Sequence, residues 1–326
     1  MKWIRHPVSC LLWILALTSG AMAQSSSVPP YPERPIHIVV PWPPGGTTDL
    51  LARLLSQSLT RSLRQSVVVE NLAGAGGNVG TRRFIQAKPD GYTLLLASSS
   101  TNAANPYLYK DLGFDPLKDF TPIALIARVP NVLVVNVESP FTTVDGLIVA
   151  AKAKPGALSY ASSGVGSSAH LAGELFKNAA TIDVLHVPYK GVAPALLDLL
   201  AGRVSFSFTT GVDGNIESRK LRPLAITTDR RAQAIPAVPT FAEVGLREVK
   251  IDVWFGLAGP AGLPAGIVRT INSAVNDALS EGELRNQLLK LGSDARADTP
   301  EHFAEFWESE VKRYADVVRL SGATPE

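Results

Sequence analysis

The feature that most constrains this chain is a repeated alternation of short β-branched runs with helical patterns. The expected strands are 36–40, 66–70, 92–98, 131–137, 158–162, 183–187, 204–208 and 221–227. Helical patterns lie between them at 48–63, 144–153, 168–179 and 193–201. Buried strands that alternate with helices indicate mostly parallel sheets with helices on both faces. The chain is therefore expected to be an α/β protein.

The alternation runs twice, which predicts two domains. After 254–262 the pattern changes to three helices, at 267–279, 283–291 and 300–320, with no strand between them. These helices need a sheet to cover, so we expect a discontinuous first domain made of residues 30–128 and 242–326. Residues 129–241 are then an inserted second domain. Open α/β sheets bind ligands beyond the carboxyl ends of their strands, so two such domains enclose a ligand cleft.

The first residues have the pattern of a secretory signal peptide. Lys2 and Arg5 precede the apolar run 10–17, and a small-residue cleavage site ends at Ala23. The apolar run is well below the ~20 residues that span a bilayer. We therefore expect residues 1–23 to be cleaved and the mature protein to be periplasmic.

Composition excludes several classes of function. The single cysteine, Cys10, lies in the expected signal peptide, so disulfides, thiolate metal sites and cysteine nucleophiles are not expected. Removing Lys2 and Arg5 leaves as many basic as acidic residues, 29 of each. A neutral mature chain argues against nucleic acid as a partner.

The first strand leads into a stiff turn, "PWPPGGTTD" at 41–49, at the start of a helix. Gly45 and Gly46 allow close approach of the backbone to a ligand, and Thr47 or Thr48 can cap the helix. Unpaired N–H groups at a helix start carry roughly half a positive charge and can hold a carboxylate. The turn is either an anion-binding loop or a capped helix start. The Asp49 carboxylate is expected to turn back towards the backbone or to meet a ligand amine.

A second loop, "SSGVGSSAH" at 162–170, repeats this design, with Ser167 or Ser168 as the cap. Two such loops, one in each domain, suit a ligand with a carboxylate at each end. His170 lies in the first helical turn and is expected to pack or cap rather than bind ligand. The loops 98–106, 186–191 and 208–214 add hydroxyl, amide and tyrosine groups, and Lys190 is expected to be exposed.

Enzymatic motifs are absent from the sequence. "GAGGNVG" at 74–80 lacks the third glycine of a dinucleotide loop, and no P-loop, hydrolase elbow or zinc-type histidine spacing occurs. Ser167, His186 and Asp213 can be combined as a serine-hydrolase triad, but any large α/β protein allows such a combination. We expect no enzyme activity, no cofactor and no metal.

Five blocks of the chain together resemble one family. They are "YPERPIHIVVPWPPGGTTDLLAR", "VVVENLAGAGGNVG", "YASSGVGSSAHLAGELFK", "HVPYKGVAPALLDLLAGRV" and "PAVPTFAEVG". In this order they resemble the Bug family, the extracytoplasmic solute-binding proteins of tripartite tricarboxylate transporters. The resemblance covers essentially the whole mature chain. It implies a type II periplasmic binding protein fold whose two α/β domains close on a small organic carboxylate.

The resemblance also implies the ligand and its site. The implied ligand is a dicarboxylate or tricarboxylate, an acidic amino acid or an aromatic carboxylate, delivered by a monomer to permease subunits in the membrane. A ligand sensor for a membrane signalling partner and, less favoured, a serine hydrolase are the alternatives. The family usually has an aspartate where this chain has Thr209, and Trp42 replaces a smaller phenylalanine. The ligand-facing positions implied by the motifs are Trp42, Gly46, Thr47, Thr48, Asp49, Thr101, Asn102, Ser163, Gly166, Ser167, Tyr189 and Thr209.

Overall fold

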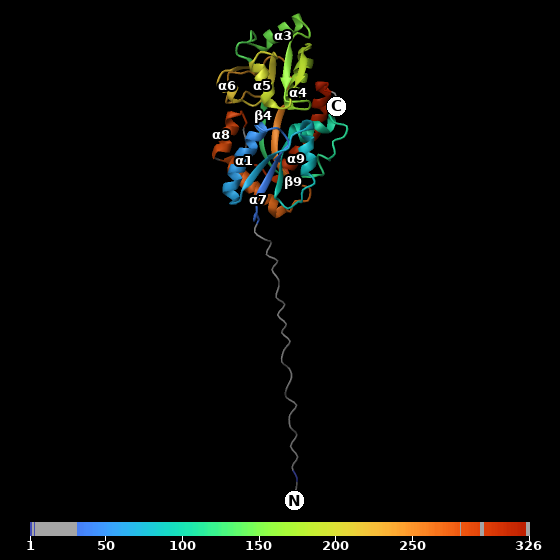
Figure 1. Ribbon diagram of the computed structural model, residues 1–326, viewed down its shortest axis with the longest axis vertical. Helices are drawn as coiled ribbons and strands as arrows, with labels where there is room; N and C mark the ends of the chain where they lie inside the picture. Colours follow the sequence, from blue (N-terminus) through green and yellow to red (C-terminus); the bar gives the residue numbers. More distant parts are fainter. Residues whose placement is uncertain (2, 4–30, 281, 294–296, 324–326) are drawn as a thin grey trace. The chain divides into compact units, whose positions relative to one another are not determined.

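The computed structural model describes Met1, Trp3 and residues 31–280, 282–293 and 297–323. Residues Pro32–Glu326 form one compact unit, which is drawn from blue to red in Figure 1. The expected signal peptide and its cleavage site lie outside the described residues. Among the residues that are described, no helix has the length and apolar character needed to cross a membrane.

The first sheet is built from both ends of the chain. Strands β1 (Ile36–Val40), β2 (Val67–Asn71) and β3 (Thr93–Ser98) pair in parallel, in the order β2-β1-β3. β9 (Asp252–Pro260) pairs antiparallel with β3 and with the first part of β4 (Phe120–Asn136). Helices α1 (Thr47–Leu63), α7 (Ala265–Ser280) and α8 (Gly282–Lys290) pack against one another, and α9 (Pro300–Ser321) packs on β4.

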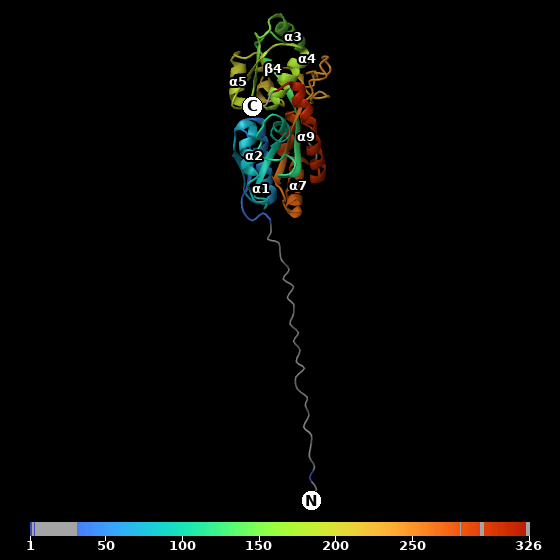
Figure 2. The ribbon, with the colours of Figure 1, turned by 90° about the vertical axis from the view of Figure 1, so that its right-hand side faces the viewer.

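The second sheet comes from the middle of the chain. β5 (Ser159–Ser162) pairs in parallel with β6 (Leu185–Pro188) and β7 (Phe206–Thr210), while β8 (Leu221–Ile226) pairs antiparallel with β4. Around it lie α3 (Val144–Ala153), α4 (Ser168–Ala180), α5 (Val192–Leu200) and α6 (Gly214–Glu217) (Figures 1 and 2). We call the parts of the chain around the first and second sheets lobe 1 and lobe 2.

One strand connects the two sheets. β4 pairs with β9 through Pro130, and from Asn131 onwards it pairs with β7 and β8. The prediction of mostly parallel sheets therefore holds for β1, β2 and β3 and for β5, β6 and β7. It is wrong for β4 and β9, whose pairings are all antiparallel.

The sequence analysis placed the start of β4 too late and missed β9. Glycines and prolines inside these strands look like breaks in the sequence, but the fold uses or accommodates them. A Cβ atom on Gly256 of β9 would lie 2.1 Å from Cζ of Phe303, so only glycine allows α9 to pack on this strand. In β4, the register shifts just after Pro122, where a bulge accommodates the residue. The short helices α2 (Asn78–Phe84), η1 (Ala75–Gly77), η2 (Ser100–Ala104) and η3 (Asn105–Tyr107) were also not predicted.

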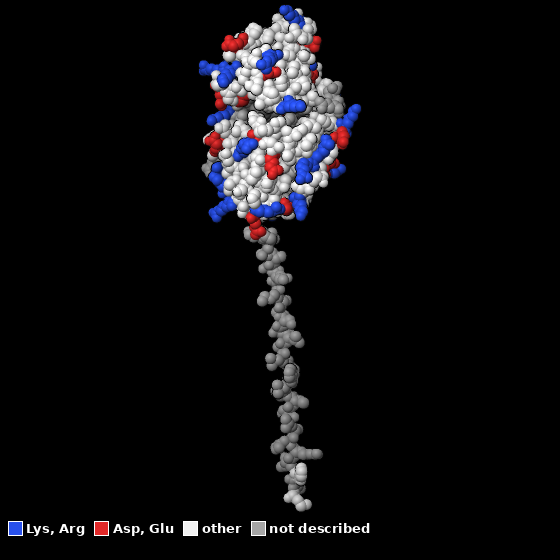
Figure 3. Space-filling view, in the orientation of Figure 1, with Lys and Arg blue, Asp and Glu red and all other residues white. Residues whose placement is uncertain are grey.

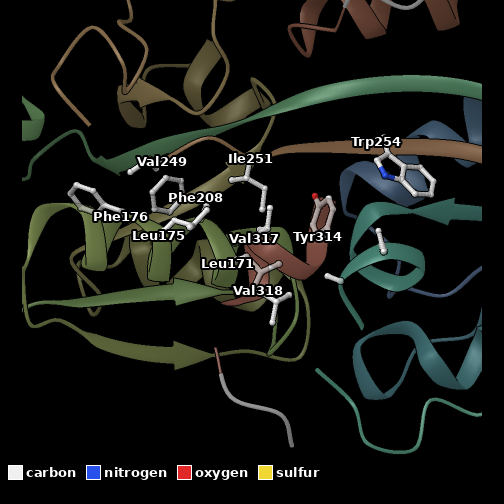
Figure 4. Packing of buried hydrophobic residues seen from close by; sticks show 14 of the residues in the cluster. Leu171, Leu175, Phe176, Phe208, Val249, Ile251, Trp254, Tyr314, Val317 and Val318 are labelled. Carbon is white, nitrogen blue, oxygen red and sulfur yellow. The ribbon is translucent and has the colours of Figure 1, made fainter. Parts of the chain in front are cut away.

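A continuous apolar core runs through both lobes. Phe176 and Phe208 of lobe 2 lie in one buried cluster with Tyr314 of α9 and Trp254 of β9 (Figure 4). The Asn178 side chain of α4 donates to the carbonyl groups of Leu320 and Ser321, at 2.9 and 3.0 Å. The C-terminal helix therefore holds the two lobes together on the side of α4.

The crossing between the lobes is fixed by one buried hydroxyl group. Thr227 Oγ1 accepts the Asn131 N–H at 3.0 Å and lies within hydrogen-bond distance of the Asn131 and Ile251 carbonyl oxygens. The Thr227 N–H donates to the Asn131 carbonyl at 3.0 Å. The two segments that pass between the sheets are therefore joined at Thr227.

Thr227→Val tests this junction. The substitution keeps the side-chain shape but leaves the buried Asn131 N–H without its acceptor, so we expect it to lower the free energy of unfolding by about 1–3 kcal/mol. Urea denaturation measures the change. Thr228→Val is the matched control, because the Thr228 hydroxyl bonds only to the Arg230 carbonyl in an exposed loop. Equal losses in both variants would contradict a special role for Thr227.

Candidate functional site

The carboxyl ends of the strands in the two lobes meet at one cavity of about 360 Å³. This volume lies at the lower end of the ~300–1,000 Å³ of small-molecule sites. The loops after β1, β3, β5 and β7 line it, together with the starts of α1, α4, α5 and α6 and the end of α8. Of the predicted ligand positions, the cavity wall contains Trp42, Gly46, Thr47, Thr48, Ser163, Ser167 and Thr209.

The start of α1 forms one side of the cavity. Gly46 is the N-cap residue, in extended conformation, and it makes no side-chain capping hydrogen bond. The first-turn N–H groups of a helix have no intrahelical acceptor. At Thr47 and Thr48 they lie in the cavity wall, where a bound anion can accept from them. The Asn71 side chain donates to the Trp42 carbonyl at 3.1 Å, which fixes the preceding turn.

Asp49 does not line the cavity. Its carboxylate is 5% exposed and accepts from the Gly45 N–H at 3.1 Å, from Arg53 Nε at 3.0 Å and from Asn71 Nδ2 at 3.0 Å. The prediction that this carboxylate turns back towards the backbone is confirmed. Burial acts to raise the pKa of Asp49, but these hydrogen bonds outweigh burial and hold the pKa below its ordinary value.

Lobe 2 contributes two helix starts. Ser167 caps α4 by accepting the His170 N–H at 3.3 Å, and its hydroxyl donates to the Gly164 carbonyl at 2.6 Å. Gly191, the N-cap of α5, makes no side-chain capping bond, like Gly46 of α1. Gly166 does not line the cavity. Its N–H donates to Nδ1 of His170 at 3.2 Å.

The two lobes touch across the cavity. The Thr47 hydroxyl donates to the Thr210 carbonyl at 3.0 Å, and the Thr210 and Ser168 hydroxyl oxygens are 3.3 Å apart. A Cβ atom on Gly191 would lie 3.2 Å from Cγ of Pro43. Residues of α1, α4 and β7, of the loop after β1 and of the N-cap of α5 therefore meet at one place.

Besides Asp49 and Gly166, three further predicted positions lie away from the cavity wall. Thr101 and Asn102 are fully buried, because the π-helical turn η2 directs them inwards, and the Asn102 side chain accepts the Ser98 N–H at 3.2 Å. Ser98 and Ser100 line the cavity in their place. The Tyr189 hydroxyl donates to Asp198 at 2.6 Å and does not reach the cavity.

Several polar residues of the cavity wall were not predicted as ligand positions from the sequence. Asp213, Asn215 and Glu217 approach from lobe 2, and Gln287 and Lys290 approach from α8. The Asp213 carboxylate accepts the Asn215 and Ile216 N–H groups and so caps α6. The loop at 208–214 was noted in the sequence. The sequence also predicted the helix at 283–291, but not that its end lines the cavity, because that position depends on tertiary packing.

Thr209 is the position at which the family resemblance implied an aspartate. It is buried in the cavity wall, and its hydroxyl donates to the Gly211 carbonyl at 3.0 Å. The wall is therefore neutral at this position. Lys190 is exposed and does not line the cavity.

The serine-hydrolase triad is not assembled. His186 Nε2 lies 2.7 Å from Oγ of Ser162, not of Ser167, and Asp213 is engaged as a helix cap. The His186 ring stacks between Tyr160 and His170, with centroid distances of 4.8 and 4.3 Å. Burial, with the neighbouring His170 and Lys177, lowers the pKa of His186 to about 3. It is therefore neutral at physiological pH, and His170 packs as predicted.

No group of three or more histidine, cysteine, aspartate or glutamate side chains suited to a metal ion occurs within the described ranges. Acidic and basic residues alternate over the face shown in Figure 3, without a large area of one sign. Backbone N–H groups and hydroxyls line the cavity together with the polar side chains of Asp213, Asn215, Glu217, Gln287 and Lys290.

The fold and this cavity between two lobes define a periplasmic binding protein. Residues 51–322 match the family model described as "Tripartite tricarboxylate transporter family receptor". The chain belongs to this family of solute-binding receptors, as the motifs predicted.

Three solved structures are similar over their whole length. The periplasmic binding protein BugD is 32% identical with a TM-score of 0.85, and 91% of this chain and all of that chain are covered. Rpa4515 of R. palustris with adipate is 36% identical with a TM-score of 0.87, at 91% and 100% coverage. MatC of Rhodopseudomonas palustris with bound malate is 32% identical with a TM-score of 0.82, at 88% and 100% coverage.

Asp49→Asn tests the support of the first loop. Because the folded-state pKa lies below the ordinary value of 3.8, the ionised carboxylate stabilises the fold at neutral pH. This stabilisation is lost as the pH falls through the folded-state pKa. We expect the variant to be less stable at neutral pH and the difference to shrink below pH 3.8. Denaturation curves over this pH range measure it, and a constant difference would contradict the assignment.

Proposed function

We propose that this protein captures a small organic dicarboxylate between its two lobes. The observation that carries the proposal is the convergence of helix starts from both lobes on one cavity. α1 and α5 begin at glycines that make no side-chain capping bond, and α4 begins at Ser167 beside them. A carboxylate supplies the acceptors that these first-turn N–H groups lack.

The electrostatics favour an anion without requiring an arginine. Each helix start carries roughly half a positive charge, and two opposed starts match the two charges of a diacid. Asp49, the acid nearest to the α1 start, is already bound by Arg53 and Asn71. Its charge is therefore balanced by partners outside the cavity.

The related structures support the ligand class. Two proteins with the same fold, at 36% and 32% identity, contain adipate and malate, which are both dicarboxylates. Tricarboxylates, acidic amino acids and aromatic carboxylates are the other ligands that the family resemblance implied. Thr209 in place of the usual aspartate removes one negative charge from the wall, which suits ligands of higher negative charge.

The lobes act as two domains that close on the ligand. We assign residues 30–128 and 242–326 to the first domain and 129–241 to the second, because β4 passes from one sheet to the other at Pro130 and Asn131. The contact between Thr47 and Thr210 has to open for a ligand to enter. Ligand contacts made by both domains then shift the population towards the closed form.

The protein works outside the cytoplasm. The expected signal peptide at 1–23 directs it to the periplasm, where it acts as a monomer without a cofactor and delivers its ligand to permease subunits. A sensor that passes occupancy to a membrane signalling partner uses the same closed form and is the second candidate. Catalysis is not proposed, since Ser167 donates to the Gly164 carbonyl and has no histidine base.

Isothermal titration calorimetry with adipate and with its neutral diamide, adipamide, tests the function. We expect adipate to bind at least about a hundredfold more tightly, because the diamide has no charge for the helix starts to stabilise. Malate and citrate extend the series to other acids. Equal affinity for adipate and adipamide would overturn the proposal. So would a protein that binds none of the acids and does not bind the diamide.

Thr47→Pro and Thr47→Val separate the backbone N–H from the side chain. Proline is tolerated at the first helical position, and Gly46 already has the extended conformation that precedes proline. Both variants lose the hydroxyl bond to Thr210, but only proline also removes the N–H. We expect Thr47→Pro to weaken adipate binding at least about tenfold more than Thr47→Val. Equal affinities would show that this N–H does not contact ligand.

A further inference from the structure

Six of the apolar residues that line the cavity lie on or near the starts of α1 and α5 and come from both lobes; we call this part of the wall the apolar end. Trp42, Pro43 and Leu50 belong to lobe 1, and Val192, Ala195 and Leu196 belong to lobe 2. We infer that this apolar end takes the carbon body of the ligand, so that the protein prefers carboxylates with several methylene groups or a ring over short hydroxylated acids. The inference deepens the proposed function and rests on it.

The lobe 2 half of this end is one face of α5. Val192, Ala195 and Leu196 are spaced i, i+3 and i+4, so their side chains project from the same side of the helix. That side lies in the cavity wall. Leu197, the next residue, is 66% exposed and lies outside the wall. The helix therefore presents a defined apolar surface to the cavity.

The lobe 1 half leaves large apolar groups only partly covered. Leu50 is 40% exposed, although it lies on a helix whose Leu51, Leu55 and Leu59 are fully buried. The Trp42 ring is half-buried and makes no aromatic or cation–π contact with the residues described by the structure. An apolar ligand group that covered these side chains would remove apolar surface from water, which is favourable.

The apolar end lies beside the helix starts that hold carboxylates. A Cβ atom on Gly46, the N-cap of α1, would lie 3.5 Å from Cγ2 of Val192, the first residue of α5. Leu50 and Leu196 lie on these same two helices and line the cavity, so we expect the methylene groups of a diacid held there to contact them. Hydroxyl groups at the same place would lose their water without gaining partners.

Malate, succinate and adipate carry the same charge. Their relative affinities therefore show whether the site prefers methylene-rich acids to short hydroxylated acids. Each buried methylene group tightens binding about fourfold, so adipate, with two more than succinate, is expected to bind the wild type about tenfold or more tightly. Malate is expected to bind no more tightly than succinate. A wild-type preference for adipate below about twofold would overturn the inference.

Leu50→Ala and Leu196→Ala remove parts of the apolar end. Each is expected to lower the ratio of adipate to succinate affinity at least about threefold in calorimetry. Leu50 lies on the exposed side of α1, so its variant tests the site without loss of core packing, while Leu196 also packs against the core of lobe 2. Melting curves check that both variants fold.

Leu197→Ala is the matched control, since it truncates the same side chain one residue away and outside the cavity wall. It is expected to keep the wild-type affinity ratio. Unchanged ratios in both cavity variants, or an equal fall in Leu197→Ala, would overturn the inference. If the wild type binds succinate, malate and adipate equally well, only this inference fails. If it binds none of the acids, the proposed function fails as well.

Discussion

The candidate site is built around the starts of α1 and α5, whose N-cap glycines make no side-chain capping bond. An α-helix always leaves its first N–H groups unpaired, and most helices satisfy them with a capping side chain. Here glycine occupies both N-cap positions, so no capping side chain accepts from the first-turn N–H groups of α1 and α5. Among the described residues no arginine lines the cavity, and Lys290 is the lysine in its wall.

The rest of the fold brings these helix starts together. β4 belongs to both sheets, and Thr227 joins the two segments that cross between them. α9 packs across lobe 1 and receives the Asn178 side chain of α4 from lobe 2. The crossing positions the lobes, while the cavity side holds only light contacts such as Thr47 with Thr210. Firm contacts at the crossing and few contacts across the cavity suit a receptor that opens and closes.

Local patterns predicted most of the elements, and α3 was predicted to the residue. The failures have one physical origin, which is packing between distant segments. Gly256 made β9 look like a loop, yet it is required by Phe303, which lies far away in the sequence. Thr101 and Asn102 follow β3 as ligand residues would, but the η2 turn buries them. Gln287 and Lys290 reach the cavity only because α8 is packed there.

The sequence by itself determined the alternating elements, the helix starts after β1 and β5, and the membership of the family. These follow from hydrophobic periodicity, capping residues and motifs, which act over a few neighbouring residues. Only the tertiary structure decided which side chains face the cavity and that β4 serves both sheets. It also decided that α5 lines the cavity with apolar side chains, while α6 and α8 line it with polar ones. Those properties arise from contacts between segments far apart in the chain, which no local pattern encodes.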